Sequence, residues 1–360
     1  MLDVFSRWYK DRFSDPHAVT LTILLVFGFS VVFFFGSLLA PLLAAIVIAY
    51  LLDWPVSSLQ RWGVNRTGAA IIVLLAFVGF TVLALLGLVP TVVKQGANFI
   101  RELPYMLNQT QGYLLTLPEK YPEMVDAEMV STLVDNVRDK LISSGEAIVS
   151  FSLGSLINIA ALLVYCILVP LLVFFMLKDK TELTQSVTRF LPENRQLATQ
   201  VWVEMNSQII NYIRGKVVEI LIVGSVSYVA FAVLDLRYSA LLAVLVGLSV
   251  LIPFIGAAAV TVPVALVGVF QWGFTSEFLY LMIAYGVIQA LDGNVLVPVL
   301  FSEAVNLHPV AIIVAVLVFG GVWGFWGIFF AIPLATLVKA VVNAWPSDKA
   351  KAAESLASAE

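Results

Sequence analysis

"GAAIIVLLAFVGFTVLALLGLVP", residues 68 to 90, contains no charged side chain. About 20 consecutive apolar residues are enough for a helix to cross the hydrocarbon core of a bilayer, so this stretch predicts a transmembrane helix. The whole chain is 61% hydrophobic and 12% charged, with a mean hydropathy of +0.97. Because a soluble protein of 360 residues could not hide that much apolar surface from water, the composition predicts a membrane protein.

Other apolar runs predict the remaining spans. Residues 18–52 are longer than one crossing requires, and Gly36 and Pro41 within them predict two helices joined by a tight turn. The further runs are residues 150–177, 216–234, 239–270, 278–299 and 309–341. The predicted fold class is therefore all-α, a polytopic membrane protein with about eight transmembrane helices, some broken by Pro or Gly.

Basic residues predict how the chain is oriented and divided. Arg7, Lys10 and Arg12 precede the first span, and the positive-inside rule then places both termini in the cytoplasm. We expect residues 1–90 to form an N-terminal cytoplasmic segment and the first three spans, and residues 91–149 a helical periplasmic subdomain. Residues 150–345 are expected to hold about five further spans, with a cytoplasmic helical segment at about 178–215, and residues 346–360 a flexible cytoplasmic tail.

The two predicted segments outside the membrane have their own patterns. Residues 91–149 are interrupted by Pro104, Pro118 and Pro122, and their later part is acidic with apolar residues at helical spacing. The inner segment carries an apolar stripe, which predicts a helix that lies along the membrane or packs on a neighbour. That stripe consists of Val201, Met205, Ile209 and Tyr212.

Several kinds of chemistry are excluded by missing motifs. The only cysteine, Cys166, allows neither an intrachain disulfide nor a thiolate metal cluster, and the only histidines are His17 and His308. There is no phosphate-binding loop for ATP and no hydrolase or zinc-protease motif, so we expect no enzyme activity, no cofactor and no metal site. The net charge of -4 and the lack of a long basic run give no reason to expect nucleic-acid binding.

Two apolar segments are interrupted by Pro and Gly. "SVLIPFIGAAAVTVP", residues 249–263, contains Pro253, Gly256 and Pro263, and "LDGNVLVP", residues 291–298, contains Asp292, Gly293, Asn294 and Pro298. Broken helices at membrane depth are tolerated only where they are buried in protein or line a water-filled cavity. A pair of such segments indicates the substrate site in secondary transporters, so these residues are candidates for a transport path.

Asp292 is the strongest candidate in this path. Tyr285 and Gln289 precede it at helical spacing, so all three residues project from one face of the helix. An intramembrane carboxylate relieves its energetic cost by protonating, pairing with a cation or reaching water, and each of these is useful to a carrier. The alternatives are structural: Asp292 could cap a helix that restarts at Asn294, and Gln289 could bond across a helix interface.

Other candidates lie near the predicted span ends. Arg214 and Lys216 flank Gly215 at the inner end of a span, where they could anchor the helix in lipid headgroups or line a cytoplasmic mouth. Glu303 and His308 are expected in an outer loop, with Pro309 at the first position of the last helix.

Small residues recur in "FGGVWGFWGIFFAIPL", residues 319–334, at spacings that let helices approach closely. Helix packing is therefore expected at Gly320, Gly321, Gly324 and Gly327.

Four motifs taken together resemble the autoinducer-2 exporter family. They are "NYIRGK" (211–216), "LIPFIGA" (251–257), "QALDGNVLVPVLFSEAVNLHP" (289–309) and "FGGVWGFWGIFFAIPLATLVKA" (319–340). The resemblance implies a bacterial inner-membrane transporter that forms a homo-oligomer, for instance a pentamer. It also implies that the acidic site of the "ALDGN" motif is Asp292, where many relatives have Glu.

The function expected from these observations is a secondary transporter or permease without ATPase activity. It would export a small solute or signal such as autoinducer-2, coupled to protons or sodium. Two alternatives remain open: transport of a lipid or amphiphile, and a non-transporting envelope scaffold that binds a periplasmic protein through residues 91–149. Membrane lipids are expected partners in all three cases.

Overall fold

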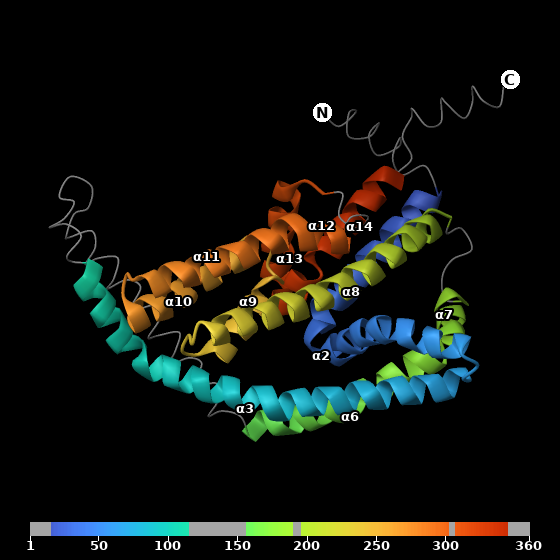
Figure 1. The fold of residues 1–360 in the computed structure, drawn as a ribbon. Helices are drawn as coiled ribbons and strands as arrows, with labels where there is room; N and C mark the ends of the chain where they lie inside the picture. The colour runs from blue at the N-terminus through green and yellow to red at the C-terminus, as the bar shows by residue number, and fades with distance from the viewer. Residues whose placement is uncertain (1–15, 115–155, 190–195, 302–306, 345–360) are drawn as a thin grey trace, which may run out of the picture. The chain divides into compact units, whose positions relative to one another are not determined.

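The structure is a computed structural model, shown in Figure 1, which describes residues 16–114, 156–189, 196–301 and 307–344. Nearly all of these residues are helical, and no strand occurs among them. The helices are α2 (Pro16–Arg61), α3 (Arg66–Leu114), α6 (Leu156–Lys178), α7 (Lys180–Arg189), α8 (Gln196–Val233), α9 (Ser239–Ser249), α10 (Ile255–Trp272), α11 (Ser276–Leu291), α12 (Val297–Phe301), α13 (Pro309–Phe329) and α14 (Ala331–Ala344). A π-helical turn, η1 (Asp292–Leu296), joins α11 to α12.

The described helices include 6 that are long and apolar enough to cross a membrane. These segments are Leu38–Arg61, Arg66–Met106, Val201–Val233, Ile255–Trp272, Ser276–Phe301 and Pro309–Phe329. Shorter apolar helical segments are Thr22–Gly36, Tyr165–Lys178, Ser239–Ser249 and Ala331–Val342. The prediction of an all-α polytopic membrane protein is confirmed.

Two predicted interruptions are absent. The turn expected at Gly36 and Pro41 does not form, because α2 continues as one helix through both residues. The interruption expected at Pro104 is also wrong, since α3 continues through Pro90 and Pro104 as far as Leu114. A proline removes one backbone hydrogen bond, whereas ending the helix in an apolar environment would expose several unpaired groups. Pro118, Pro122 and the rest of the predicted outer subdomain, residues 115–149, lie outside the described residues.

The inner helix expected before residue 216 is continuous with the following span, and its cytoplasmic position stays a prediction. α8 runs without interruption from Gln196 to Val233, so the apolar stripe expected before residue 216 continues into the membrane segment. The buried positions follow one face of the helix at intervals of three or four residues. They include Val201, Met205, Tyr212, Lys216, Glu219, Val223 and Ser227.

The chain divides into two compact units. Unit 1 contains residues Met1–Leu74, Leu168–Gly215 and Phe301–Glu360, and unit 2 contains Leu75–Ile167 and Lys216–Leu300. In unit 1, Val201 and Met205 of α8 pack against Ala340 of α14. The Tyr212 hydroxyl donates a hydrogen bond to the Phe329 carbonyl oxygen at 3.1 Å, which ties the same face of α8 to α13.

Unit 2 has a larger apolar core, formed mainly by α8, α9, α10 and α11. α8 and α9 meet at two glycines: a Cβ atom on Gly247 would lie 3.0 Å from the Cα atom of Gly224 and from the Ile220 carbonyl oxygen. This close approach brings the end of α9 beside the middle of α8. The fully buried members of the core are Met106, Phe231, Leu242, Val246, Val264, Val267 and Leu281.

At one end of unit 2, Arg237 joins the α8–α9 connection to α3. Its Nη2 atom lies 3.0 Å from the Glu102 carboxylate, and its guanidinium lies 5.4 Å from the Tyr238 ring centre and 5.6 Å from that of Phe270. The Arg237 and Glu102 side chains are 45% and 36% exposed, so water screens their attraction.

We expect this ion pair to contribute little to stability. A double-mutant cycle with Arg237→Gln and Glu102→Gln should give a coupling free energy of about 0.2–1 kcal/mol, measured by unfolding in detergent, and the value should fall in high salt. A coupling above about 2 kcal/mol that salt does not change would contradict the screening argument.

Candidate functional site

Lys216 and Glu219 form an ion pair inside unit 2. They lie three residues apart on α8, with 2.7 Å between the Lys216 Nζ atom and the Glu219 Oε2 atom, and their side chains are 5% and 2% exposed. Both belong to the apolar segment Val201–Val233. Charged groups this deep in an apolar helix are expensive unless they are paired, and they mark ion or substrate pathways. Because Lys216 is buried, it does not extend into lipid headgroups as the expected anchor would, and its role at a cytoplasmic mouth stays a prediction.

The end of α9 holds the Lys216 ammonium in place. α9 stops at Ser249, and the Lys216 Nζ atom donates a second hydrogen bond, at 2.8 Å, to the carbonyl oxygen of Val250. The last carbonyl groups of a helix lack partners within it and form the negative end of its dipole, which attracts a cation. The helix break thus supplies part of the polar surroundings that a buried lysine needs.

This break is the one that the sequence predicts around Pro253 and Gly256. Residues 250–254 separate α9 from α10, and Phe254 has a φ of 63°, in the region that favours glycine. The Gly256 N–H donates to the Ile252 carbonyl oxygen at 2.8 Å. A Cβ atom on Gly256 would overlap the Ser249 carbonyl oxygen, so only glycine fits where α10 begins.

The second predicted break has a different form. Instead of interrupting the helix, Asp292, Gly293 and Asn294 belong to the π-helical turn η1, and Pro298 lies in α12 just after it. Pro298 has no N–H to close a regular helical bond with the preceding turn, while the Asn294 side chain donates to the Ala290 carbonyl oxygen at 2.8 Å. A wider turn keeps the chain helical, and such π turns occur frequently at functional sites.

Asp292 completes a cluster of three charged side chains. It is close enough to interact electrostatically with both Lys216 and Glu219. Its Oδ1 atom is buried and has no hydrogen-bond partner among the described residues. α11, η1 and α12 follow one another without a break, so no helix restarts at Asn294 for Asp292 to cap. We call Lys216, Glu219 and Asp292 the buried charge cluster.

Tyr285 and Gln289 extend this face of α11, as predicted. The Tyr285 hydroxyl donates to the Ala257 carbonyl oxygen at 3.1 Å and accepts from Thr261 at 3.2 Å. Ala257 directly follows Gly256, so these bonds attach α11 to the first two turns of α10. The amide nitrogen of Gln289 is buried and, like Asp292 Oδ1, lacks a hydrogen-bond partner in the part of the chain that the structure describes. Unit 2 therefore brings the two predicted interruptions together.

Glu219 is a site residue that the motifs do not single out. The readable signal is its spacing: Lys216, Glu219, Val223 and Ser227 repeat at helical intervals, so a polar stripe continues along an apolar span. A lysine and a glutamate three residues apart in such a span predict an internal ion pair.

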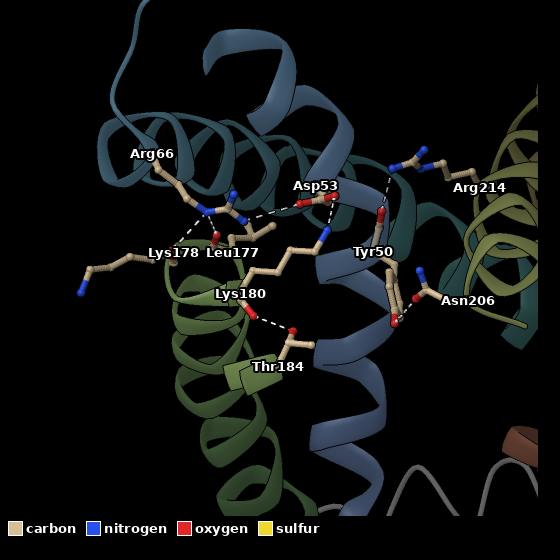
Figure 2. Close-up of polar contacts among 9 residues, drawn as sticks. All are labelled: Tyr50, Asp53, Arg66, Leu177, Lys178, Lys180, Thr184, Asn206 and Arg214. Carbon is tan, nitrogen blue, oxygen red and sulfur yellow. Dashed lines mark hydrogen bonds and ion pairs between the residues drawn. The ribbon is translucent and has the colours of Figure 1, made fainter. Parts of the chain in front are cut away.

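Arg214, by contrast, belongs to unit 1. Figure 2 shows its guanidinium next to Tyr50, whose carbonyl oxygen accepts a bond from Nη2 at 3.4 Å. The Tyr50 hydroxyl in turn donates to the Asn206 side chain at 3.0 Å. Arg214 therefore ties α8 to α2 in this unit.

Two outer-loop candidates were expected after α12. Glu303 lies outside the described residues. His308 is exposed, and its Nδ1 atom accepts a hydrogen bond from the Val310 N–H at 3.3 Å, which makes it the cap of α13. Pro309 occupies the first position of this helix, as predicted.

The glycine-rich stretch contains a kink in α13. Gly324, with φ 57° and ψ −132°, breaks the regular geometry of α13. Cβ atoms on Gly320 and Gly327 would meet Ile328 and the Phe319 carbonyl oxygen, which belong to the same helix, and one on Gly321 would meet nothing within 4 Å. Gly324 therefore permits a kink, and Gly320 and Gly327 lie where the two halves of α13 approach each other closely. Packing of these glycines against another helix stays a prediction.

Metal chemistry finds no support in the described residues. They contain no group of three or more His, Cys, Asp or Glu side chains that could hold a metal ion. Cys166 is exposed on α6.

Apolar helices of membrane-spanning length and a charge cluster buried among them define a polytopic membrane protein with a polar site inside it. The sequence profile of the AI-2E family transporters matches residues 21–347, and the chain belongs to this family. It is thus a multi-pass membrane protein of a transporter family, and the resemblance inferred from its motifs is confirmed.

Individual relatives cover almost the same length. The chain is 54% identical over 346 residues to a protein of Escherichia coli (strain K12) that bears the name permease PerM, covering 96% of this chain and 98% of the relative. It is 24% identical over 319 residues to the transport protein YueF of Bacillus subtilis (strain 168), covering 85% and 84%. It is also 24% identical over 327 residues to the AI-2 transport protein TqsA of Escherichia coli (strain K12), covering 89% and 91%.

Proposed function

We propose that this protein is a secondary permease that moves a small polar solute across the bacterial inner membrane and couples this movement to protons or a monovalent cation. The buried charge cluster is the observation that carries the proposal. Its two carboxylates and one ammonium give a net charge of about −1 when all three are ionised, in surroundings that disfavour any net charge. Binding of one proton or one monovalent cation would neutralise the cluster.

Asp292 is the group at which this neutralisation would occur. Lys216 already pairs with Glu219 and with the Val250 carbonyl oxygen, whereas Asp292 Oδ1 has no hydrogen-bond partner among the described residues. The unpaired carboxylate gains most from a proton or cation, because its charged form is the least compensated of the three. A carrier whose stability changes with cation binding can favour a different conformation in each state.

The class of substrate is supported by one relative. TqsA, the relative named as an AI-2 transport protein, aligns with 89% of this chain, so a small polar signal such as autoinducer-2 is the first solute to test. The family resemblance implies export as the direction of movement, and Arg7, Lys10 and Arg12 predict that both termini lie in the cytoplasm.

The test is flux in liposomes that contain the purified protein. Efflux of loaded autoinducer-2 and an internal pH dye should respond to imposed sodium or proton gradients. Asp292→Asn should lower the gradient-driven flux at least about tenfold, a loss of about 1.4 kcal/mol or more, because the amide neither takes up a proton nor supplies the negative charge that attracts a cation.

A matched control lies at the other end of the same helix. Glu277 is exposed at the start of α11, and Glu277→Gln should leave the flux unchanged. Equal flux in wild type and Asp292→Asn would overturn the coupling role of Asp292. If no tested solute crossed with either folded protein, an amphiphile substrate or a scaffold role would be favoured.

A further inference from the structure

We propose that unit 1 binds the phosphate of an anionic phospholipid headgroup at the ends of α2, α3 and α6 and the start of α7. At its centre Arg66 and Lys180 pair with Asp53, as Figure 2 shows, while Arg61 ends α2 and Lys178 ends α6. We call Arg61, Arg66, Lys178 and Lys180 the basic cluster. The inference is independent of the buried charge cluster, which lies in unit 2.

Arg66 is the fixed centre of the basic cluster. Its Nε atom donates to the carbonyl oxygens of Leu177 and Lys178, at 2.7 and 3.1 Å, at the end of α6. Its Nη2 atom lies 3.8 Å from Asp53, is buried, and has no hydrogen-bond partner among the described residues. A guanidinium with a free donor beside other cations is a suitable group for a phosphate oxygen.

Asp53 neutralises only part of the surrounding positive charge. Asp53 accepts a hydrogen bond from Lys180 Nζ at 3.0 Å. A second ion pair joins Lys178 Nζ and Asp179 Oδ1, which lie 3.5 Å apart. Residues 53–66 and 177–189 together hold five basic and three acidic side chains, a net charge of +2. Ion pairs within the protein need only equal numbers of basic and acidic side chains. The two surplus positive charges therefore favour binding of an external anion.

The basic cluster lies at the ends of apolar segments, and this position favours a lipid headgroup as that anion. The apolar segment of α2 ends at Arg61, that of α3 begins at Arg66, and that of α6 ends at Lys178. These residues therefore lie where the hydrocarbon core gives way to headgroups. Trp54 and Trp62 are 64% and 82% exposed in the same region, and tryptophan is enriched at this depth of the bilayer. A phosphate held there has apolar surface next to it for acyl chains.

The experiment measures how strongly the full-length protein prefers the anionic lipid. Vesicles of phosphatidylcholine containing increasing fractions of phosphatidylglycerol with brominated chains quench tryptophan fluorescence when the brominated lipid occupies adjacent sites. Brominated phosphatidylcholine gives the reference curve. The ratio of the two curves is the relative binding constant for phosphatidylglycerol.

Two variants should move this constant in opposite directions. Arg61→Gln/Lys178→Gln should lower it at least about fivefold, since each basic residue near the membrane surface contributes about a fivefold attraction. Asp53→Asn should raise it, because removing the internal carboxylate leaves more positive charge for the phosphate. Lys94→Gln/Arg101→Gln removes the same charge from exposed positions of α3 in unit 2 and should leave the constant unchanged.

Two results would overturn the proposal. One is an equal loss of preference in Arg61→Gln/Lys178→Gln and in Lys94→Gln/Arg101→Gln, which would mean general attraction without a site. The other is removal of the preference by millimolar inorganic phosphate, which would assign the basic cluster to a soluble anion. A decrease in the first variant, an increase in Asp53→Asn and insensitivity to inorganic phosphate would together establish the lipid site.

Discussion

Replacing Lys216 with methionine should lower the free energy of unfolding by about 3–5 kcal/mol. The substitution keeps an unbranched side chain but removes the ammonium that lies 2.7 Å from Glu219 and 2.8 Å from the Val250 carbonyl oxygen. Glu219 is 2% exposed, so its carboxylate would remain buried without that compensation. The measurement is reversible unfolding in mixed micelles, followed by far-UV circular dichroism.

The double variant Lys216→Met/Glu219→Gln tests whether the loss of stability comes from the unpaired charge of Glu219 or from lost packing of the lysine side chain. It removes both charges, so it should be more stable than Lys216→Met alone, by a large part of the loss. Lys94→Met, at an exposed position of α3, should change stability by no more than about 0.5 kcal/mol. If the double variant were as unstable as the single one, packing of the lysine stem would explain the loss, and the ion pair would not.

Some contacts of the site can be predicted from the sequence and others cannot. The difference depends on how far apart along the chain the two residues lie. The pairing of Lys216 with Glu219 is local, because residues three apart on a helix share a face, and it can be recognised once both are placed in one span. Hydropathy alone puts Lys216 at a span end, since polar residues precede it on α8. The bond to Val250 joins positions 34 residues apart and depends on how α8 packs against α9. No local pattern contains that information.

The form of the predicted helix breaks is likewise not determined by the local sequence alone. Proline and glycine mark places where regular hydrogen bonding is difficult, but they do not determine how the chain responds. At Pro253 the helix ends and a new one begins, at Pro298 it passes through a π turn, and at Pro41 it continues. The outcome depends on which neighbouring groups bond to the carbonyl oxygens near the break. These groups include the Lys216 ammonium at Val250 and the Asn294 amide at Ala290.

Gly256→Ala should be the most damaging single-methyl change in unit 2. A Cβ atom at this position would overlap the backbone carbonyl oxygen of Ser249, and backbone atoms cannot move aside as the end of a side chain can. The added methyl group must push the end of α9 away from the start of α10. We expect the free energy of unfolding to fall by at least about 3 kcal/mol, which exceeds most cases of overpacking because the opposing atom is fixed.

The same displacement should reach the buried charge cluster. Val250, whose carbonyl oxygen accepts a bond from Lys216, directly follows Ser249. Gly256→Ala should therefore reduce flux in liposomes even in the fraction that remains folded. Gly286→Ala provides the control, because Gly286 is in α11 with no atom within 4 Å of the added Cβ atom, and alanine there should be neutral or stabilising by about 0.5–1 kcal/mol. If Gly256→Ala were as stable and as active as Gly286→Ala, the tight junction between α9 and α10 could not be what positions the carbonyl group for Lys216.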